Sequence, residues 1–417
     1  MSSTQKVEKL AALCALIWFV FIIDACFTWF LSWHVRYAIG FPLVLYSTIV
    51  LKREQRLVLT KQRRICVLLL VLLIILQTID YRYTALLCYG PLALILLWDE
   101  QVLLKLYNYI KRFIVFYAVV SIIVVVLVLT DTWSFLPHIE LPPQDIVQEN
   151  LNTTNHFFGL FVIPQYGYEM SFYRAMGPLR EGGHFSIFLG FIYFIERCVG
   201  HRRNIWIIIA GLLTLSPNFV FFYITAEGYV ALSRKKAIRF LLQTVGFVAV
   251  IVAAVWFSPD SIKEELVKIV LERSLQENVG NMDSNGFMAL LEGRTDLGGE
   301  LIYAKFVKRA GLITKLKGMS VVDGDFVLSD FRLLIILYGY IGMLLFLGIS
   351  YVIGKMSQNN FYGICVFILG IFVMISRAWM LQQAYVWTMM FMASIVFCYG
   401  NTKDSNMEKF VDVKNLI

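Results

Sequence analysis

Residues 113–130 read FIVFYAVVSIIVVVLVLT, eighteen residues without one charged side chain. A helix of about 20 such residues is needed to cross the hydrocarbon core of a bilayer, which is ~30 Å thick. Several other stretches of the chain have a similar length and composition. The pattern therefore predicts a polytopic α-helical membrane protein.

The composition of the whole chain supports this interpretation. Of its 417 residues, 59% are hydrophobic and 16% are charged, whereas soluble domains have about 45–50% and about 25%. A soluble protein is therefore excluded. The net charge of +8 is attributed to cytoplasmic loops, so no nucleic-acid partner is expected, and membrane lipids are the surrounding medium. The seven cysteines show no CxxC spacing, so we expect no disulfide, no metal site and no cofactor.

Twelve apolar stretches are predicted to span the membrane. They cover residues 10–33, 37–51, 65–80, 84–98, 113–130, 183–196, 204–216, 218–233, 240–258, 329–352, 361–377 and 383–399. The segment 204–233 is long for one helix and short for two, and Ser216-Pro217 interrupts it. Two spans keep the basic loops on one side, which the positive-inside rule favours. Both termini are therefore predicted to be cytoplasmic.

The spans divide the chain into six parts. Five helices fill residues 1–130, a first long outer loop covers 131–182, four helices fill 183–258, a second long outer loop covers 259–328, three helices fill 329–400, and 401–417 form a cytoplasmic tail. Long connections in a tightly looped protein usually carry function. Apolar residues in helical spacing within 301–308 indicate that the second loop is folded.

The end of the first outer loop is the richest in chemically useful residues. Tyr173, Arg174, Arg180, Glu181 and His184 lie among three glycines and a proline, directly before a span. Guanidinium groups bind phosphate oxygens in pairs and stay charged, so the arginines are suited to a diphosphate. Glu181 and His184 are the nearest candidate proton acceptors. The plainer alternative is that the arginines only reach the lipid headgroups and that Glu181 pairs with one of them.

The second outer loop offers a smaller polar set. Arg294 lies in its middle, and Asp325, Asp330 and Arg332 follow at the boundary with the next span. The spacing of the carboxylates does not match a calcium-binding loop, so metal binding is not expected there. The loop contains no histidine.

Two acidic residues lie within predicted spans, where a charge is costly and invites a functional explanation. Glu227 is seven residues before Arg234 and is expected to pair with it near the membrane surface. Asp24 is close to the outer edge of the first span.

Together these features resemble the bacterial O-antigen or capsule repeat-unit polymerases of the Wzy type, within the O-antigen polymerase and ligase superfamily. Three signatures carry the resemblance: Arg174-x-x-Gly177-x-x-x-Glu181-x-Gly183-x-Phe185 before a span, the broken helix pair at Ser216-Pro217, and Arg294 followed by Gly318 and Asp330 before Gly339 and Gly342. A second glycine close to Gly318, typical of the family, is missing.

The resemblance implies an inner-membrane glycosyltransferase with a GT-C-like arrangement of helices and its site on the periplasmic face. It implies metal-independent, inverting transfer of a glycan from undecaprenyl diphosphate to the next lipid-linked repeat unit. Arg174, Arg180 and Arg294 are expected to bind the diphosphate and the glycan, with Glu181 as the base and His184 beside it. Tyr173, Asp325, Asp330 and Arg332 are expected to contact the substrate, and a chain-length-regulating co-polymerase is an expected partner.

Three other functions stay open at this point. The related ligases transfer the finished glycan to lipid A core, but they carry a histidine in the second loop, which this chain lacks. A flippase or other transporter for lipid-linked oligosaccharides also has about twelve spans, but it would concentrate charge inside the bundle. A structural protein would not require arginines at the mouths of two loops.

Overall fold

The fold is that of a computed structural model, and the described part of the chain comprises residues 3–78, 84–142, 154–165, 174–179, 181–200, 202–236, 238, 297–319, 331–377, 380–381 and 384–400. Most of this part is helical. Its thirteen α-helices are α1 (Ser3–Ile22), α2 (Trp33–Arg53), α3 (Lys61–Thr78), α4 (Thr84–Ile95), α5 (Glu100–Leu129), α7 (Gly182–Val199), α8 (Ile205–Leu213), α9 (Pro217–Ser233), α14 (Leu297–Arg309), α15 (Leu312–Lys317), α16 (Phe331–Lys355), α17 (Asn360–Ser376) and α18 (Tyr385–Gly400).

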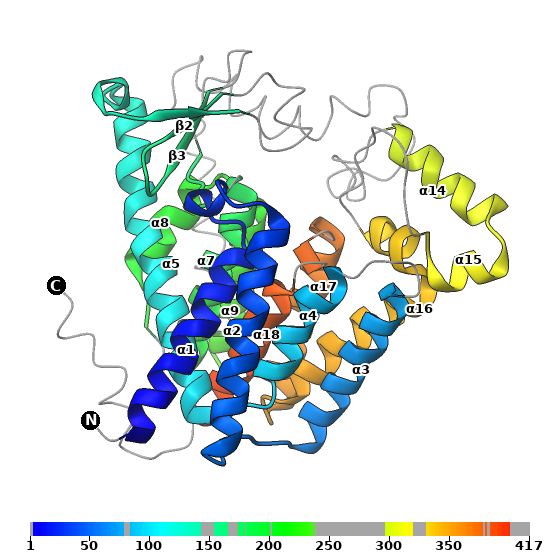
Figure 1. The fold of residues 1–417 in the computed structure, drawn as a ribbon. Coiled ribbons are helices and arrows are strands. Elements are labelled where there is room, and N and C mark those ends of the chain that lie inside the picture. The colour runs from blue at the N-terminus through cyan, green and yellow to red at the C-terminus, as the bar shows by residue number, and fades with distance from the viewer. Residues whose placement is uncertain are drawn as a thin grey trace.

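All of these helices except α14 and α15 form one bundle with two distinct ends (Figure 1). A small β-sheet lies at one end, which we call the sheet end. At the opposite end, Glu8 forms ion pairs with Arg56 and Lys105, and Arg63 pairs with Glu100. We call this the charged end. Figure 1 shows α1 starting at the bottom of the view, at the charged end, and the strands at the top.

Among the described helices, three are long and apolar enough to cross a membrane, as expected of a membrane protein: α2, α5 and α16. The longest is α5 with 30 residues. Apolar helices of 10–17 residues include α17, α18 and most of α4.

The described helices overlap eleven of the twelve predicted spans, and the stretch 240–258 lies outside the described residues. The bounds differ most for α1, which ends at Ile22 and not at residue 33, and for α5, which begins at Glu100 and not at residue 113. The break at Ser216-Pro217 is present, since α8 ends at Leu213 and α9 begins at Pro217. The Ser216 hydroxyl accepts a hydrogen bond from the Asn218 amide and so caps α9. At nine residues, α8 is only about 14 Å long, well short of a full crossing.

The first outer loop contains strands, which the all-α prediction did not include. Strands β1 (Ile139–Leu141), β2 (Thr154–Phe157) and β3 (Val162–Gln165) form an antiparallel sheet in the order β1-β2-β3. Gly159, with φ +84°, turns the chain between β2 and β3, a conformation that glycine adopts readily. Phe157 and Val162 then pack on Cys26, just after α1.

The second outer loop is represented by α14 and α15, and the helical pattern predicted at 301–308 is confirmed. Phe306 of α14 packs against Ile335 and Ile336 of α16. Figure 1 shows α14 and α15 beside the upper part of the bundle, next to α16.

Helix α16 is broken where α15 meets it. Gly339 has φ +66° and ψ −176°, far from helical values, and Gly318, which follows α15, has φ +88°. The Met319 amide donates a hydrogen bond of 2.7 Å to the Ile336 carbonyl. The two glycines therefore allow the backbones of α15 and α16 to touch.

Candidate functional site

The candidate site lies at the start of α7, at the sheet end of the bundle. Glu181 is the N-cap residue of α7, and its carbonyl accepts hydrogen bonds from the amides of His184 and Phe185. Its side chain does not cap the helix and is 43% exposed. His184, one turn later, has a side chain only 9% exposed. The helix start thus presents an accessible carboxylate above a buried imidazole.

Arg377 joins these two residues. It is the C-cap residue of α17, and its side chain is 5% exposed. Its Nη1 donates a hydrogen bond of 2.8 Å to Glu181 Oε2 and lies 3.2 Å from His184 Nε2. The same imidazole nitrogen is 3.7 Å from Glu181 Oε2. Three ionisable groups from two helices therefore meet at one point.

Gly183 makes room for this guanidinium group. A Cβ atom at position 183 would lie 2.2 Å from Arg377 Nη2, well inside van der Waals contact. The neighbouring Gly182 is similarly crowded, since a Cβ there would be 3.0 Å from the Ala175 carbonyl oxygen and 3.1 Å from that of Thr214. The glycine pair thus lets α17 and the α8–α9 turn approach the start of α7.

The α8–α9 turn supports the start of α7 from the side. The Ser186 hydroxyl donates to the Gly183 carbonyl at 2.7 Å and lies 3.1 Å from the Ser216 hydroxyl. The Asn218 side-chain amide donates to the same Gly183 carbonyl at 3.3 Å. These buried hydrogen bonds fix the backbone under Glu181 and His184, which is the preorganisation that a catalytic site requires.

Arg377 is held on its own side as well. Its amide donates to the Val373 carbonyl at 2.7 Å, and its carbonyl accepts from the Met380 amide at 3.0 Å. Buried Tyr385, at the start of α18, lies near Arg377, Asp24 and Glu181. Asp24 forms a buried ion pair with Arg36. A second pair of opposite charges therefore borders the cluster.

The residues predicted from the sequence divide into three groups. Glu181 and His184 are brought together, and the Arg174 side chain lies beside Gly182, whose added Cβ would be 3.4 Å from Arg174 Cβ. The guanidinium carbon of Arg332 lies 6.0 Å from the ring centre of Tyr303 in α14. Tyr173, Arg180, Arg294, Asp325 and Asp330 lie outside the described residues.

Arg377 is not among the residues predicted from the sequence. It lies 196 residues after Glu181 and at the end of the eleventh predicted span, 361–377, near a boundary that carries no glycine-rich or acidic motif. One signal was available, because Arg377 is a basic residue at the outer end of a predicted span, where the positive-inside rule disfavours it. A charge in that place suggests a specific partner.

The pairing predicted for Glu227 is wrong. Its carboxylate accepts hydrogen bonds from Arg197 Nε at 2.7 Å, Arg203 Nη2 at 2.8 Å and the Tyr193 hydroxyl at 2.6 Å, whereas Arg234 is the exposed C-cap of α9. Helix packing brings α7 against α9 and so makes Arg197 the nearer cation. This cluster is on α7 too, about 20 Å along the helix from His184.

The two clusters on α7 differ in a way that bears on function. Glu227 is buried and surrounded by three donors, as a structural ion pair requires. Glu181 is partly open to solvent and shares one guanidinium with an imidazole. A carboxylate and an imidazole beside a fixed cation at a helix N-terminus can bind an anionic group and accept a proton.

Comparison of the chain with protein-family models, with curated proteins and with solved structures gives no match.

Proposed function

We propose that the protein is an inner-membrane polymerase of undecaprenyl-diphosphate-linked O-antigen or capsule repeat units. The observation that carries the proposal is the Glu181–His184–Arg377 cluster at the sheet end of the bundle. It agrees with the resemblance to Wzy-type polymerases, in which the stretch from Arg174 to Phe185 was expected to hold the site.

The cluster suits glycosyl transfer from a diphosphate. When the bond between the sugar and the phosphate oxygen breaks, negative charge develops on the leaving lipid diphosphate. Arg377 is a fixed cation next to the N-terminus of α7, with Arg174 close by, and such preorganised positive charge stabilises the transition state. No metal ion is required for this step.

The acceptor sugar hydroxyl must lose a proton as it attacks. Glu181 is the favoured acceptor because its carboxylate is exposed while Arg377 fixes one of its oxygens. His184 is the alternative, at 3.7 Å from the same oxygen. Attack on the face of the sugar opposite the diphosphate inverts the configuration at the anomeric carbon.

The proposed topology places the sheet end in the periplasm and the charged end in the cytoplasm. The eleven bundle helices and the undescribed stretch 240–258 together supply twelve crossings of a GT-C-like protein, with both termini cytoplasmic. Arg56, Arg63 and Lys105 at the charged end then obey the positive-inside rule.

Two related activities are kept as alternatives, O-antigen ligation to lipid A core and flipping or transport of a lipid-linked oligosaccharide. The missing second-loop histidine favours polymerisation over ligation. A deletion strain separates the possibilities by its glycan profile. Single repeats on lipid A core indicate a polymerase, an uncapped core indicates a ligase or a flippase, and an unchanged profile indicates neither.

The test of the site uses purified variants and a lipid-linked repeat unit, with polymer ladders on gels as the readout. Glu181→Gln keeps the shape of the side chain but removes the base, and we expect the rate to fall about 10²–10⁴-fold. Arg377→Lys keeps the charge but removes the forked donor, and we expect a fall of about 10-fold or more.

Arg197→Lys is the matched control, because Arg197 also pairs with a carboxylate, that of Glu227 in α9, at the end of α7 opposite to Glu181. It should form ladders at the wild-type rate, and gel filtration should give the same elution for all three variants. Wild-type ladders from both Glu181→Gln and Arg377→Lys would overturn the proposed site.

A further inference from the structure

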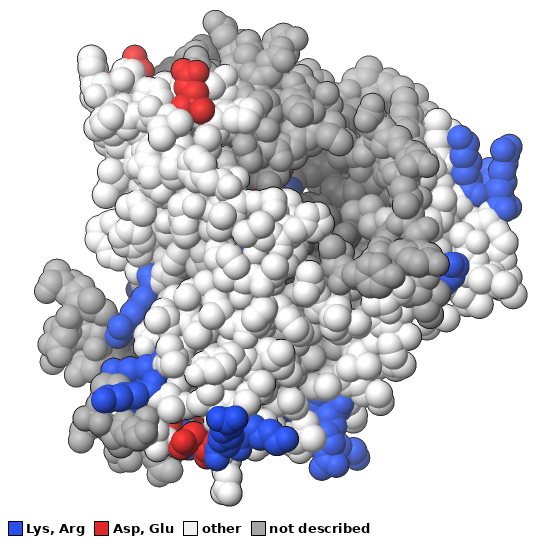
Figure 2. All heavy atoms as spheres, in the orientation of Figure 1, with Lys and Arg blue, Asp and Glu red and all other residues white. Residues whose placement is uncertain are grey.

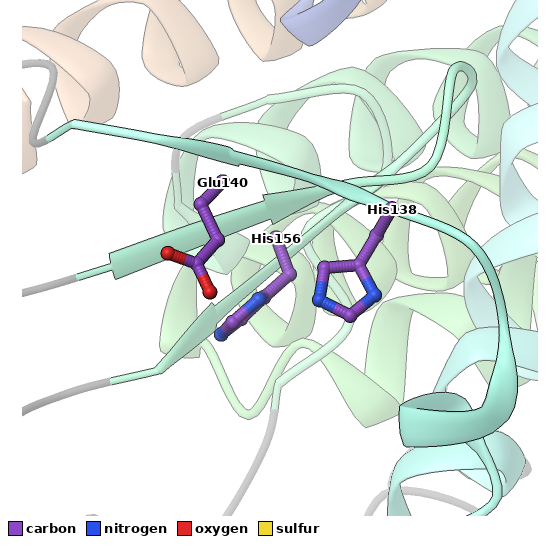
Figure 3. Close-up of side chains that lie close together, drawn as sticks. All are labelled: His138, Glu140 and His156. Carbon is purple, nitrogen blue, oxygen red and sulfur yellow. The ribbon is translucent and has the colours of Figure 1, made fainter.

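Two histidines and a glutamate converge on the sheet of the first outer loop. His138 precedes β1, Glu140 is in β1 and His156 is in β2. Their potential ligand atoms, the imidazole nitrogens and a carboxylate oxygen, all lie within 4.8 Å of one another. Figure 3 shows His156 between the other two, with all three side chains on the same side of the strands.

Strand pairing creates this arrangement. Glu140 and His156 are direct partners in the antiparallel register of β1 and β2, and such partners have neighbouring side chains on one face of the sheet. His138 is two residues before Glu140, so it points to the same face. The three groups are therefore held together by the backbone.

His138 is oriented as a metal ligand. Its Nδ1 lies 2.9 Å from the Leu136 carbonyl oxygen, which can only accept, so Nδ1 carries the proton. In the neutral ring Nε2 then has the free electron pair. A hydrogen bond from the second ring nitrogen to a carbonyl is the usual way in which proteins orient a metal-binding histidine.

Aromatic rings surround the cluster. The ring centre of Trp133 lies 5.0 Å from that of His156, and Phe158 lies 5.2 Å from His138. His156 itself is buried, whereas Glu140 is exposed. A site with an apolar wall and one open side resembles the surroundings of many bound metals and leaves access for an ion.

We propose that His138, Glu140 and His156 bind one divalent transition-metal ion, with Zn²⁺ as the best match. Two imidazole nitrogens and a carboxylate oxygen form a common zinc-binding set, and water completes the coordination. Bonds of about 2.0–2.2 Å require ligand atoms roughly 3.4 Å apart, so the present separations of up to 4.8 Å must close by up to about 1.4 Å. Exposed Glu140 reaches this by rotation about its side-chain bonds.

The ion ties together a sheet that is otherwise small. Strands of three and four residues form few hydrogen bonds, so one ion shared by β1 and β2 adds a substantial part of their pairing energy. The site shares no residue with the Glu181–His184–Arg377 cluster. Its role is to fix the first outer loop over Cys26, and it is not a step in the transfer reaction.

The test measures Zn²⁺ in the full-length protein, purified in detergent with a tag that contains no histidine. We expect about one equivalent of Zn²⁺ by elemental analysis after dialysis, and a visible absorption band when Co²⁺ replaces it. His138→Ala should lose both signals. Glu140→Gln should weaken Zn²⁺ binding by at least the roughly 10–100-fold that loss of an outer-shell partner costs.

Two matched controls separate this site from nonspecific binding. His34→Ala removes another exposed histidine, and Glu54→Gln removes another exposed carboxylate; both should bind Zn²⁺ as the wild type does. Glu140 is exposed, so its substitution should not unfold the protein. Equal Zn²⁺ affinity in wild type, His138→Ala and Glu140→Gln, or no bound Zn²⁺ in the wild type, would overturn the proposal.

Discussion

Single residues determine the geometry of the candidate site, and the missing Cβ of Gly183 has the largest effect. The guanidinium group of Arg377 occupies the place where any other residue would have its Cβ. The group cannot easily move elsewhere, because it is buried and bonded to Glu181. Because Gly183 in α7 has no Cβ, the guanidinium group of Arg377, at the end of α17, can lie against the start of α7.

Gly183→Ala should displace the Arg377 guanidinium and lower ladder formation about as much as Arg377→Ala does. Combining the two substitutions provides the decisive measurement. Because both act through one contact, the double variant should be no slower than Arg377→Ala alone. Additive losses in the double variant would show that Gly183 acts independently of Arg377.

At this level the sequence was informative only where neighbours in the chain are also neighbours in space. Glu181 and His184 are one helical turn apart, so their proximity followed from the expected helix. Arg377 and the partners of Glu227 come from other helices, and helix packing selected them. His138, Glu140 and His156 lie together because of the pairing of β1 and β2. The sequence had predicted helices only, so this pairing was not expected.

Among the helices, α16 has the least regular backbone. Its break at Gly339 lies against α15, where a Cβ on Gly339 would be 2.2 Å from the Leu316 carbonyl oxygen. Broken helices in membrane proteins often line a substrate path. Here the break fastens the second outer loop to the bundle, so α14 and α15 are positioned relative to the first loop.

Gly339→Ala should detach α15 from α16 without unfolding the bundle. A backbone at φ +66° and ψ −176° lies in a region that essentially only glycine adopts and costs alanine roughly 1–3 kcal/mol, and the contact with Leu316 adds to this. We expect faster cleavage by trypsin after Lys315 and Lys317, measured by mass spectrometry of the fragments.

Gly348→Ala in the same helix is the control for this experiment. A Cβ at position 348 meets only Leu69 Cδ1 at 3.5 Å, an ordinary contact, and alanine favours a helix over glycine by about 0.5–1 kcal/mol. Its cleavage pattern should equal that of the wild type. If Gly339→Ala were also cleaved like the wild type, the contact would not hold the loop.

Helix positions were largely predictable because apolar length and local caps determine them. Asp99, Ser216 and Asn359 each accept a hydrogen bond from the first turn of the helix that follows, and each is a polar residue at the end of a short connection between two helices. The sheet was not predicted, because its strands are too short to show an alternating pattern. The shortness of α8 was not predicted either, since hydropathy does not report where backbone hydrogen bonds end.

Charged side chains are distributed unevenly along the bundle, so its two ends can be told apart. Figure 2 shows lysine and arginine side chains gathered along the lower edge of the described surface, with a broad uncharged band above them. Exposed basic residues at that edge include Lys52, Arg53, Lys61 and Arg64. A band free of charge between two polar ends is what a membrane-embedded bundle requires.

Which end of the bundle faces the periplasm can be tested in whole cells. Phe135 in the first outer loop is 85% exposed and Leu312 in the second is 73% exposed, while Leu59 at the charged end is 48% exposed. The native cysteines interfere little, because six are buried and Cys398 is partly buried. Single cysteines at these three positions therefore report which end faces the periplasm.

We expect Phe135→Cys and Leu312→Cys to react with a maleimide that cannot cross the inner membrane, and Leu59→Cys to react only after the membrane is opened. The reason is that both outer loops lie at the end bearing Glu181 and Arg377, which the proposed function places in the periplasm. Labelling of Leu59→Cys alone in intact cells would invert the topology and place the candidate site in the cytoplasm. The proposed polymerase activity would then be untenable, because its lipid-linked substrates are joined on the periplasmic side.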